Sequence, residues 1–414
     1  MKKLILFHFL LIISNGLKAQ ESNRLMAGAS AAIINPPVGS FIAGDKQNRQ
    51  FTGVHDDLFA KAVVISDHND IIAFLTIDCI GLLYPQLVQI RNEVKKTLPE
   101  FPTAHIVLSS THTHSGPDVV GIWGPDMLHS GVDTNYIHRL VFTAAQQIIT
   151  AYRNRVPVQA VYATATYGEN WVENISQPGE IDPSVTILQL VNKKKKNIAT
   201  LTNFACHPTF LDGINDKVSA DYVAGSYELL NKKQGGVNMF LQGPIGGWVQ
   251  PEHEPHTVDA AYKRGHGLAE TVLNAMKNKN KILGTAIVFR SKQVIMPLAN
   301  PGFQQLSAMG VINRKFSDSV MTEIAWFSIG NSFFATHPGE TVPAMGLATK
   351  LLMQTNGPKF VLGLGMDALG YILKPEFFDA TKKIPHSGYL CSMSIGIETM
   401  NYVMKTLELL AKDD

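Results

Sequence analysis

The sequence predicts a mixed α/β fold, in which a mixed β-sheet core with hairpins is flanked by helices in a single large domain. Segments with alternating apolar residues, as in strands, are interspersed with segments in which apolar residues recur at helical spacing. Some expected strands follow one another directly, whereas others are separated by a helix, and this favours a mixed sheet over a uniformly parallel barrel. No Gly/Ser/Pro-rich linker divides the 414 residues, so one domain is the simplest organisation.

The first half of the chain predicts one hairpin, two helices and two single strands. Leu87, Ile90 and Val94, for example, recur at helical spacing. The expected elements, in order, are strands 62–65 and 71–77 around a turn at 67–70, a helix over 85–98, a strand over 106–108, a helix over 134–152 and a strand over 158–166.

The second half begins with a further hairpin. Four lysines, 193–196, lie between the apolar alternations 185–191 and 198–206, which predicts the solvated tip of a hairpin. A nucleic-acid patch is less favoured because the run has no aromatic neighbours. Helices are then expected near 222–230, 259–276, 341–353 and 399–410, and strands near 237–241, 282–294, 324–329, 333–336 and 360–364.

Composition indicates a globular chain with a large core: 45% of the residues are hydrophobic and 17% are charged. The formal net charge of +2 gives no reason to expect nucleic acid as a partner. The three cysteines, Cys79, Cys206 and Cys391, have no paired spacing, which argues against a disulfide framework or a cysteine-rich metal site.

The first residues resemble an export signal. Lys2 and Lys3 precede an apolar run over 4–13, and a more polar stretch follows. We expect residues 1–20 to be a signal peptide cleaved near Ala19, which would make residues 21–414 the mature, periplasmic or secreted protein. The apolar run is too short to span a bilayer.

Two histidines two residues apart are the strongest local feature. His112 and His114 follow the expected strand 106–108, and residues two apart on a strand share a face, so both imidazoles can point at one metal ion. Two surface histidines at a strand end are the plainer alternative. The pattern of metallo-β-lactamase-like hydrolases would need Asp and His at Gly116 and Pro117, and the regular series of an amidohydrolase barrel is disfavoured by the preceding hairpin and helix.

Two further candidate metal ligands follow expected strands. His207 precedes Pro208, which ends the strand and keeps the imidazole at the sheet edge. Glu340 follows a strand and the turn His337-Pro338-Gly339. The sequence therefore predicts that side chains far apart along the chain converge at the ends of core strands.

The motifs in combination resemble the catalytic domain of the neutral, non-lysosomal ceramidase family. The similar segments run, in the family's order, from about Gly28 to about Gly396. They are Gly53-Val54-His55-Asp56-Asp57-Leu58-Phe59-Ala60-Lys61-Ala62, Thr111-His112-Thr113-His114-Ser115-Gly116-Pro117, His207-Pro208-Thr209, Ser219-Ala220-Asp221-Tyr222, His337-Pro338-Gly339-Glu340 and Gly370-Tyr371.

The resemblance implies one Zn²⁺ per chain, bound by His112, His114, His207, Glu340 and Tyr371. Tyr371 matches the second tyrosine of the family's Tyr-x-x-Tyr segment, whereas Ala368 replaces the first. The resemblance also implies an amidohydrolase that cleaves an N-acyl amide, as in the conversion of ceramide to sphingosine and fatty acid, by zinc-bound water.

Two alternatives to a ceramidase remain. The protein could be a zinc esterase or deacylase acting on a glycan or another amphiphile, or a non-catalytic homologue that retains only the fold. We expect a small amphiphilic or acyl-amide substrate, and with it peripheral contact with a membrane; the sequence does not indicate an oligomeric state.

The chain departs from the family pattern in two places. The family's catalytic serine aligns with Gly246 in Gly243-Pro244-Ile245-Gly246-Gly247-Trp248, so we expect attack by metal-bound water, with glycine amides of this loop holding the oxyanion. A tight turn that needs glycine for its backbone geometry is the alternative. We also expect no C-terminal immunoglobulin-like domain of the family type, because residue 414 follows the tyrosine segment closely.

His55 and Asp221 complete the expected site. His55 would line the pocket, with a hydrogen-bonded structural histidine as the alternative. Asp221 would orient a ligand histidine or, alternatively, cap the helix that follows it.

Overall fold

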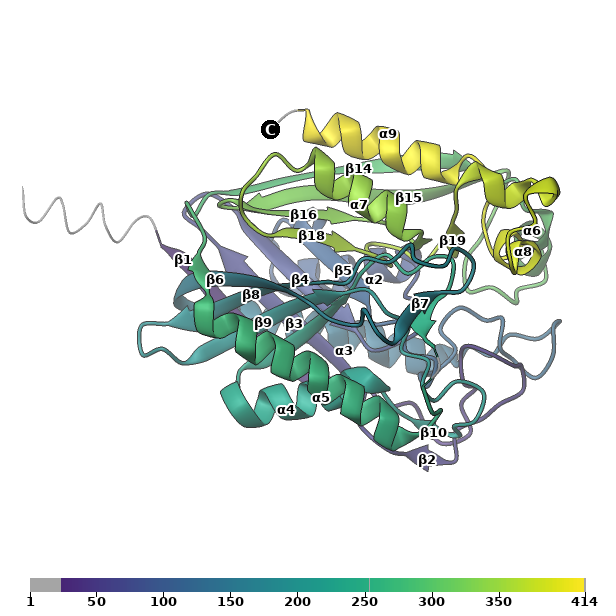
Figure 1. The fold of residues 1–414 in the computed structure, drawn as a ribbon, viewed down its shortest axis with the longest axis horizontal. Coiled ribbons are helices and arrows are strands. Elements are labelled where there is room, and N and C mark those ends of the chain that lie inside the picture. The colour runs from purple at the N-terminus through teal and green to yellow at the C-terminus, as the bar shows by residue number, and fades with distance from the viewer. Residues whose placement is uncertain (1–23, 253, 413–414) are drawn as a thin grey trace, which may run out of the picture.

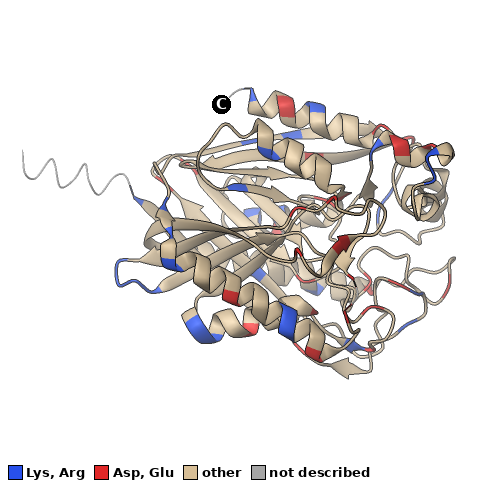
Figure 2. Ribbon diagram, viewed as in Figure 1, with Lys and Arg blue, Asp and Glu red and all other residues tan. Residues whose placement is uncertain are grey.

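The computed structural model describes residues 24–252 and 254–412, and the expected signal peptide, 1–20, lies outside these ranges. The mixed α/β fold class is confirmed, with the strands divided mainly between a large and a small sheet (Figure 1). Figure 2 shows that Lys, Arg, Asp and Glu lie mainly on the helices and loops outside the sheets. The four lysines 193–196 are exposed in the turn of their hairpin, as expected.

The large sheet has nine strands and mixes both pairing directions. Gln242 at one edge donates through its side chain to the carbonyl of Thr111, which follows the strand at the other edge. The sheet therefore curls until its edges approach, and the loops after both edge strands lie close together. Its path is β11 (Val237–Gln242), β9 (Asn197–Phe204), β8 (Ser184–Asn192), β6 (Val156–Thr166), β1 (Leu25–Ile33), β3 (Phe59–Ser66), β4 (Ile71–Ile77) and β5 (Ile106–Ser110), with β13 (Asn280–Lys281) paired to β6.

The small sheet faces the large one through aromatic side chains. Phe74 of β4 packs against Phe327 and Phe334, with ring centroids 5.6 and 5.3 Å away. Phe334 also stacks on Phe360 at 4.4 Å, so the two sheets share an aromatic layer. The strands of the small sheet, in order, are β14 (Ile287–Pro297), β15 (Ser319–Ile329), β16 (Ser332–Thr336) and β18 (Lys359–Leu362), of which only β16 and β18 are parallel.

Helices cover the outer surfaces of the two sheets (Figure 1). Helix α3 packs against β1, β3 and α2, helices α4 and α5 pack against each other beside β11 and β6, and α9 covers β14 and β15. The helices are α2 (Tyr84–Thr97), α3 (Thr134–Arg153), α4 (Tyr222–Gln234), α5 (Val258–Ala275), α6 (Pro301–Ala308), α7 (Pro343–Leu352), α8 (Ser387–Ser392) and α9 (Thr399–Ala411), with 3-10 turns η1 (Thr103–His105), η2 (Met276–Asn278), η3 (Pro375–Phe378) and η4 (Ala380–Lys382). Within the described ranges, no helix is both long and apolar enough to cross a bilayer.

Short strand pairs complete the fold around the loops. They are β2 (Gly53–Val54) with β10 (Lys217–Val218), β7 (Val172–Asn174) with β12 (Val249–Pro251), and β17 (Glu340–Thr341) with β19 (Tyr371–Ile372). The third pair is parallel and places Glu340 directly beside Tyr371.

The buried apolar residues form two clusters, one on the large sheet and one between the small sheet and helices α7 and α9. Val120 and Ala368 pack against both clusters. We call the boundary between the two clusters the seam. A pocket opens along it, and the candidate metal ligands lie there.

Candidate metal centre

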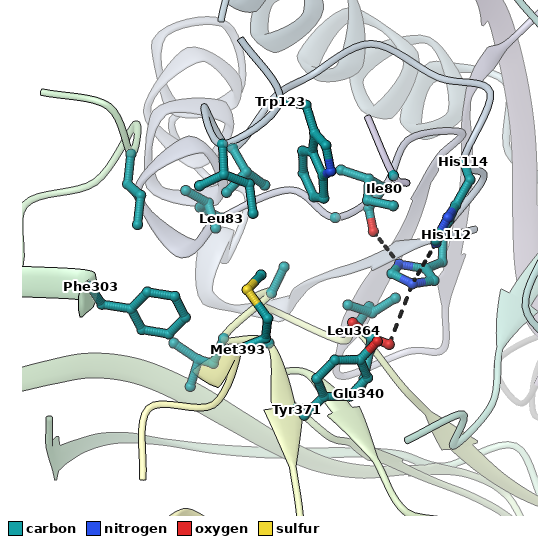
Figure 3. Close-up of a pocket in the computed structure, with 18 of the residues that line it drawn as sticks. Ile80, Leu83, His112, His114, Trp123, Phe303, Glu340, Leu364, Tyr371 and Met393 are labelled. Carbon is teal, nitrogen blue, oxygen red and sulfur yellow. Dashed lines mark hydrogen bonds and ion pairs between the residues drawn. The ribbon is translucent and has the colours of Figure 1, made fainter. Parts of the chain in front are cut away.

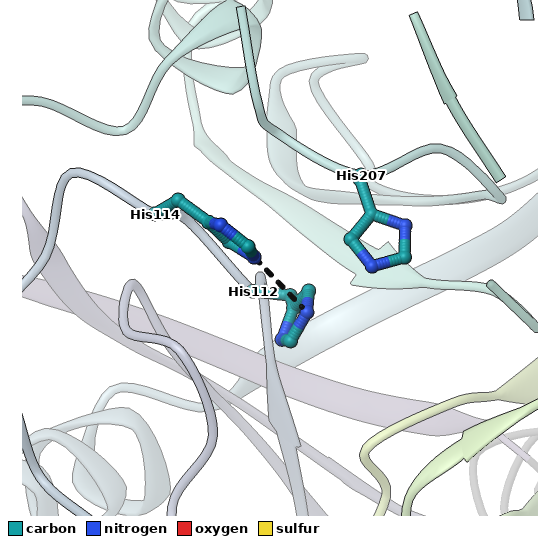
Figure 4. Close-up of side chains that lie close together, drawn as sticks. All are labelled: His112, His114 and His207. Carbon is teal, nitrogen blue, oxygen red and sulfur yellow. Dashed lines mark hydrogen bonds between the residues drawn. The ribbon is translucent and has the colours of Figure 1, made fainter. Parts of the chain in front are cut away.

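Three loops that follow core strands bring four of the predicted ligands together. His112 and His114 follow β5, His207 follows β9, and Glu340 follows β16 (Figure 4 shows the three histidines). The nitrogens that the histidines offer lie within 4.8 Å of one another. Nε2 of His112 lies 3.4 Å from Nε2 of His114, and Oε2 of Glu340 lies 3.1 Å from Nε2 of His207. The predicted convergence of these four side chains is therefore present in the structure.

The backbone at His112 explains why the two neighbouring histidines converge. Strand β5 ends at Ser110, so strand alternation does not orient the pair as expected. His112 instead has a left-handed conformation, with φ of 69°, which is uncommon and costly for a residue with a side chain. Its amide donates to the carbonyl of Cys79 at 2.9 Å. A turn held by this contact, rather than a shared strand face, directs the imidazole inward.

Backbone carbonyls fix the proton position on two of the imidazoles. Nδ1 of His112 lies 2.5 Å from the carbonyl oxygen of Ile80, and Nδ1 of His207 lies 2.8 Å from that of Val249. A carbonyl oxygen can only accept, so each Nδ1 bears the hydrogen. In the neutral rings each Nε2 then presents a lone pair towards the centre of the site, as a metal ligand does.

His114 is held by a carboxylate that the sequence analysis missed. Its Nδ1 lies 3.0 Å from Oδ2 of Asp212. Burial opposes protonation of His114, but Asp212 outweighs it, so the pKa of His114 is raised and that of Asp212 is lowered. Arg49 lies 3.7 Å from the other Asp212 oxygen. An Asp five residues after His207 in a loop forms no recognisable motif, so the sequence contained no signal for this pair.

Glu340 and Tyr371 reach the site from paired short strands. Glu340 donates its amide to the Gly370 carbonyl at 2.9 Å. Burial would raise the pKa of Glu340, but His112 and His207 outweigh burial and hold it well below its usual range. The pKa of Tyr371 is raised, first by burial and then by the charge of Glu340. The structure thus brings the fifth predicted ligand, Tyr371, to the carboxylate edge of the cluster.

The donor set fits a zinc ion. Zinc commonly takes imidazole nitrogens and carboxylate oxygens at about 2.0–2.2 Å, and a tetrahedron with such bonds has edges of about 3.3–3.6 Å. The contacts between ligand atoms are 3.4 Å for His112–His114, 3.1 Å for His207–Glu340 and 3.5 Å for His112–Glu340. Nitrogens that face one another without hydrogens between them repel, and a shared cation removes that repulsion.

An apolar pocket opens beside these ligands (Figure 3). Including its open mouth, it encloses about 810 Å³. His112, His114, Glu340 and Tyr371 form its polar end. Its apolar wall includes Ile80, Leu83, Trp123, Phe303, Leu364 and Met393. The site therefore combines a cluster of metal-type ligands with space for an apolar group.

The structure does not bring His55 to this pocket. His55 is exposed, and its ring lies 5.8 Å from that of Tyr262 on α5. Its amide donates to the carbonyl of Val218, which supports the short strand pair there. The expected pocket position of His55 is therefore corrected to a surface position.

Asp221 caps a helix and does not bind a ligand histidine. Its carboxylate accepts from the amide of Tyr222, at the start of α4, and from the amide of Leu211 at 2.9 Å. Burial raises the pKa of Asp221 to about 7. Of the two expected roles, the structure supports the cap, and the orienting role belongs to Asp212.

Gly246 is required for close backbone approach. Its amide donates to the Thr341 carbonyl at 2.8 Å, so this N–H is not available to an oxyanion. A Cβ atom at Gly246 would lie 2.5 Å from the carbonyl oxygen of Glu340. The expected oxyanion role of Gly246 is therefore corrected: the missing side chain lets the loop pack against the strand that carries Glu340.

Curated relatives match part of the chain. A neutral ceramidase from Drosophila pseudoobscura pseudoobscura is 24% identical over 252 residues, which cover 54% of this chain and 34% of that protein. Neutral ceramidase B from Dictyostelium discoideum is 25% identical over 167 residues, 35% of this chain and 22% of that protein. The chain thus spans about a third or less of the length of these two relatives.

Solved structures share the fold over nearly the whole chain. The crystal structure of neutral ceramidase from Pseudomonas aeruginosa matches with a TM-score of 0.78 and 16% identity, covering 94% of this chain and 75% of that one. A structure described as ceramidase complexed with C2 matches with a TM-score of 0.77. The model of the neutral/alkaline non-lysosomal ceramidase N-terminal domain matches residues 29–250, more than half of the 414 residues. With the resemblance of its motifs, this match shows that the chain belongs to the neutral/alkaline non-lysosomal ceramidase family.

Proposed function

We propose that this protein is an exported, zinc-dependent hydrolase that cleaves the N-acyl amide of an amphiphile, with ceramide as the first candidate substrate. The observation that supports it most is the convergence of three imidazole Nε2 atoms and the Glu340 carboxylate at the polar end of an apolar pocket. Family membership favours the same chemistry, because the matched relatives are named neutral ceramidases.

In this proposal, His112, His114, His207 and Glu340 hold the zinc ion, and Tyr371 completes the set. Bound zinc supplies Lewis acidity, which polarises a carbonyl group and makes water acidic near neutral pH. The Ile80 and Val249 carbonyls and the Asp212 carboxylate keep the imidazole hydrogens on Nδ1, so Nε2 stays available.

The pocket wall would bind the apolar chain of the substrate. Burial of each methylene contributes about 0.8 kcal/mol, so a chain of several carbons along Leu83 and Phe303 would fix the amide beside the ligand cluster and exclude water from the pocket. Because Gly246 provides no side-chain nucleophile, the proposal assigns the attack on the acyl carbon to water. The carbon–nitrogen bond breaks, the oxygen of water remains on the acyl group, and protons pass to the released amine.

Metal analysis followed by a substrate panel tests this function. We expect one zinc per chain in the purified protein, loss of activity on chelation and recovery on adding zinc. Incubation with a long-chain ceramide, short N-acyl amides and matched acyl esters should release fatty acid and the long-chain amine from ceramide.

Other results would point elsewhere. A zinc-loaded protein that cleaves only esters or acylated glycans would contradict amide specificity and favour a zinc esterase or deacylase. Tight zinc binding with no turnover over the whole panel would favour a binding protein, and a purified protein that binds no zinc would contradict the proposal as a whole.

A further inference from the structure

Trp248 contacts the predicted metal ligand Tyr371 directly. The indole Nε1 of Trp248 donates to the hydroxyl oxygen of Tyr371 at 2.8 Å. An indole N–H is a donor only, so it occupies a lone pair on that oxygen in either protonation form of the phenol. The hydrogen of the Tyr371 hydroxyl is then directed away from the indole, and the Glu340 carboxylate is within hydrogen-bonding reach of this hydroxyl.

The loop that bears Trp248 contacts His207, Tyr371 and the residue that follows Glu340. Gly246 donates to the carbonyl of Thr341, the residue after Glu340. The Val249 carbonyl accepts from both the amide and Nδ1 of His207, each at 2.8 Å. Trp248 lies between these two anchor points, so the position of its indole is set relative to both halves of the site.

The backbone of Trp248 has an unfavourable conformation, and in this conformation its side chain reaches Tyr371. Its φ is 62°, a left-handed value that is an outlier for a bulky residue, and Gly247 before it has φ of 86°. Such a conformation costs about 1–3 kcal/mol and persists only where the surroundings hold it. If this turn only connected two segments, a glycine at this position would adopt the same backbone conformation without that cost.

Aromatic packing holds the indole on its other side. The ring of His386 lies 4.5 Å from the Trp248 ring, and the ring of Tyr389 lies 5.5 Å from it. Tyr389 also lines the pocket. The indole therefore packs against residues at the start of α8 while its N–H contacts Tyr371, so the Tyr371 hydroxyl meets a donor that is held in place.

We propose that Trp248 is a positioning residue that holds the Tyr371 hydroxyl oxygen at the metal centre. This inference rests on the proposed function only in requiring that the site bind zinc. The indole N–H would hold Tyr371 in place as Asp212 and two backbone carbonyls hold the histidines. Loss of such a hydrogen-bonded partner commonly weakens metal binding by about 10- to 100-fold.

A double-mutant cycle on zinc affinity tests the inference. Trp248→Phe keeps an aromatic ring against His386 and removes the N–H, Tyr371→Phe removes the oxygen, and the double variant removes both. We expect each single variant to bind zinc about 10- to 100-fold more weakly in a chelator competition, and the double variant to bind about as weakly as Tyr371→Phe alone. Trp171→Phe is the matched control, because Trp171 is buried among aromatic side chains and does not line the pocket, and the zinc affinity of this variant should equal that of the wild type.

The spectrum of the Co²⁺-substituted protein provides a readout independent of affinity. Trp248→Phe and Tyr371→Phe should change the visible bands in the same direction, since both alter the same ligand. The inference would be overturned if the losses of zinc affinity in the two single variants added up in the double variant. A Trp248→Phe spectrum equal to that of the wild type would also overturn it, and either result would leave a zinc centre intact. A wild type that binds no zinc would overturn both proposals. Circular dichroism spectra of all variants confirm that each is folded before the comparison.

Discussion

The carboxylate of Asp212 keeps the hydrogen of His114 on Nδ1 and adds negative charge next to the ligand cluster. Asp212→Asn keeps the size and one acceptor oxygen but removes the charge. We expect the zinc affinity to fall about 10- to 100-fold, as chelator competition would measure. Asp45→Asn is the control, because Asp45 lies 3.7 Å from Arg49 in the same charge network. Equal affinities of the two variants would contradict this role of Asp212.

His337 makes a pH-dependent contribution to stability. It is buried between the hydroxyls of Thr341 and Thr349, and burial lowers its pKa to about 3. Below pH ~6.5 the His337 imidazole binds a proton in the unfolded chain but stays neutral in the folded protein. Its contribution to stability is therefore complete above this pH and is lost as the pH falls towards 3.

The variant His337→Asn isolates this contribution. Denaturant unfolding at pH 7.5 and at pH 5 should show that the wild type loses about 2 kcal/mol more stability than the variant, because the slope reaches about 1.4 kcal/mol per pH unit only below pH ~6.5. The variant is expected to be less stable at pH 7.5, and only the difference in slope decides the question. Parallel pH profiles for the two proteins would show that His337 does not titrate on unfolding.

Residue types and motifs revealed the ligands but not their partners. His112, His114, His207 and Glu340 follow strands, and the resemblance added Tyr371; all five lie at the site. Asp212 and Trp248 act through contacts between loops, for which spacing along the chain provides no signal. His55 and Asp221 belong to family-like segments, yet the structure uses one at the surface and the other as a helix cap.

At the level of the elements, the loop at Gly246 determines how closely the strand of Glu340 can approach. In Gly246→Ala, the new Cβ would lie 2.5 Å from the Glu340 carbonyl oxygen, a distance that backbone cannot tolerate. We expect a loss of about 1–3 kcal/mol in unfolding free energy and weaker zinc binding. Gly53→Ala is the control, since no atom lies within 4 Å of its added Cβ. A Gly246→Ala protein as stable as Gly53→Ala would contradict the assigned packing role.

Strong periodicity predicted most elements, and its absence explains the missed ones. The helices over Tyr84–Thr97 and Thr134–Arg153 and the hairpin of β8 and β9 were predicted within a few residues. Strand β1 was missed because it is rich in Ala and Gly, and Gly28 is needed where a Cβ would meet the Ala151 carbonyl of α3 at 2.1 Å. Two-residue strands such as β17 are too short for any pattern.

For the whole molecule, a bound metal would join the two halves across the seam. The histidines belong to loops of the large sheet, and Glu340 and Tyr371 to segments beside the small one. Ligands that bind only the folded state stabilise it, by about 2.7 kcal/mol at a free concentration 100 times Kd. We expect chelation to lower Tm by about 3 °C for a chain of this length. In Glu340→Gln, which retains the shape of the side chain, chelation should change Tm little or not at all. A wild type whose Tm does not respond to chelation would contradict this coupling.

The division of the strands into two sheets could not be predicted from the sequence. Apolar alternation identifies a strand but not its neighbour, and β4 and β15 are both largely buried although they belong to different sheets. The aromatic layer that joins the sheets depends on Phe74, Phe327 and Phe334, which are far apart along the chain. The mixed α/β class was predictable because it depends only on the succession of elements.

The position of the ligands along the chain has a consequence for biosynthesis. Residues 29–250 contain all three histidines but neither Glu340 nor Tyr371. A polypeptide that has been synthesised only this far contains the three histidines of the cluster but lacks its carboxylate and phenol ligands. If the protein binds zinc as proposed, its complete ligand set forms only after the segment that contains Glu340 and Tyr371 has docked against the loops of the three histidines.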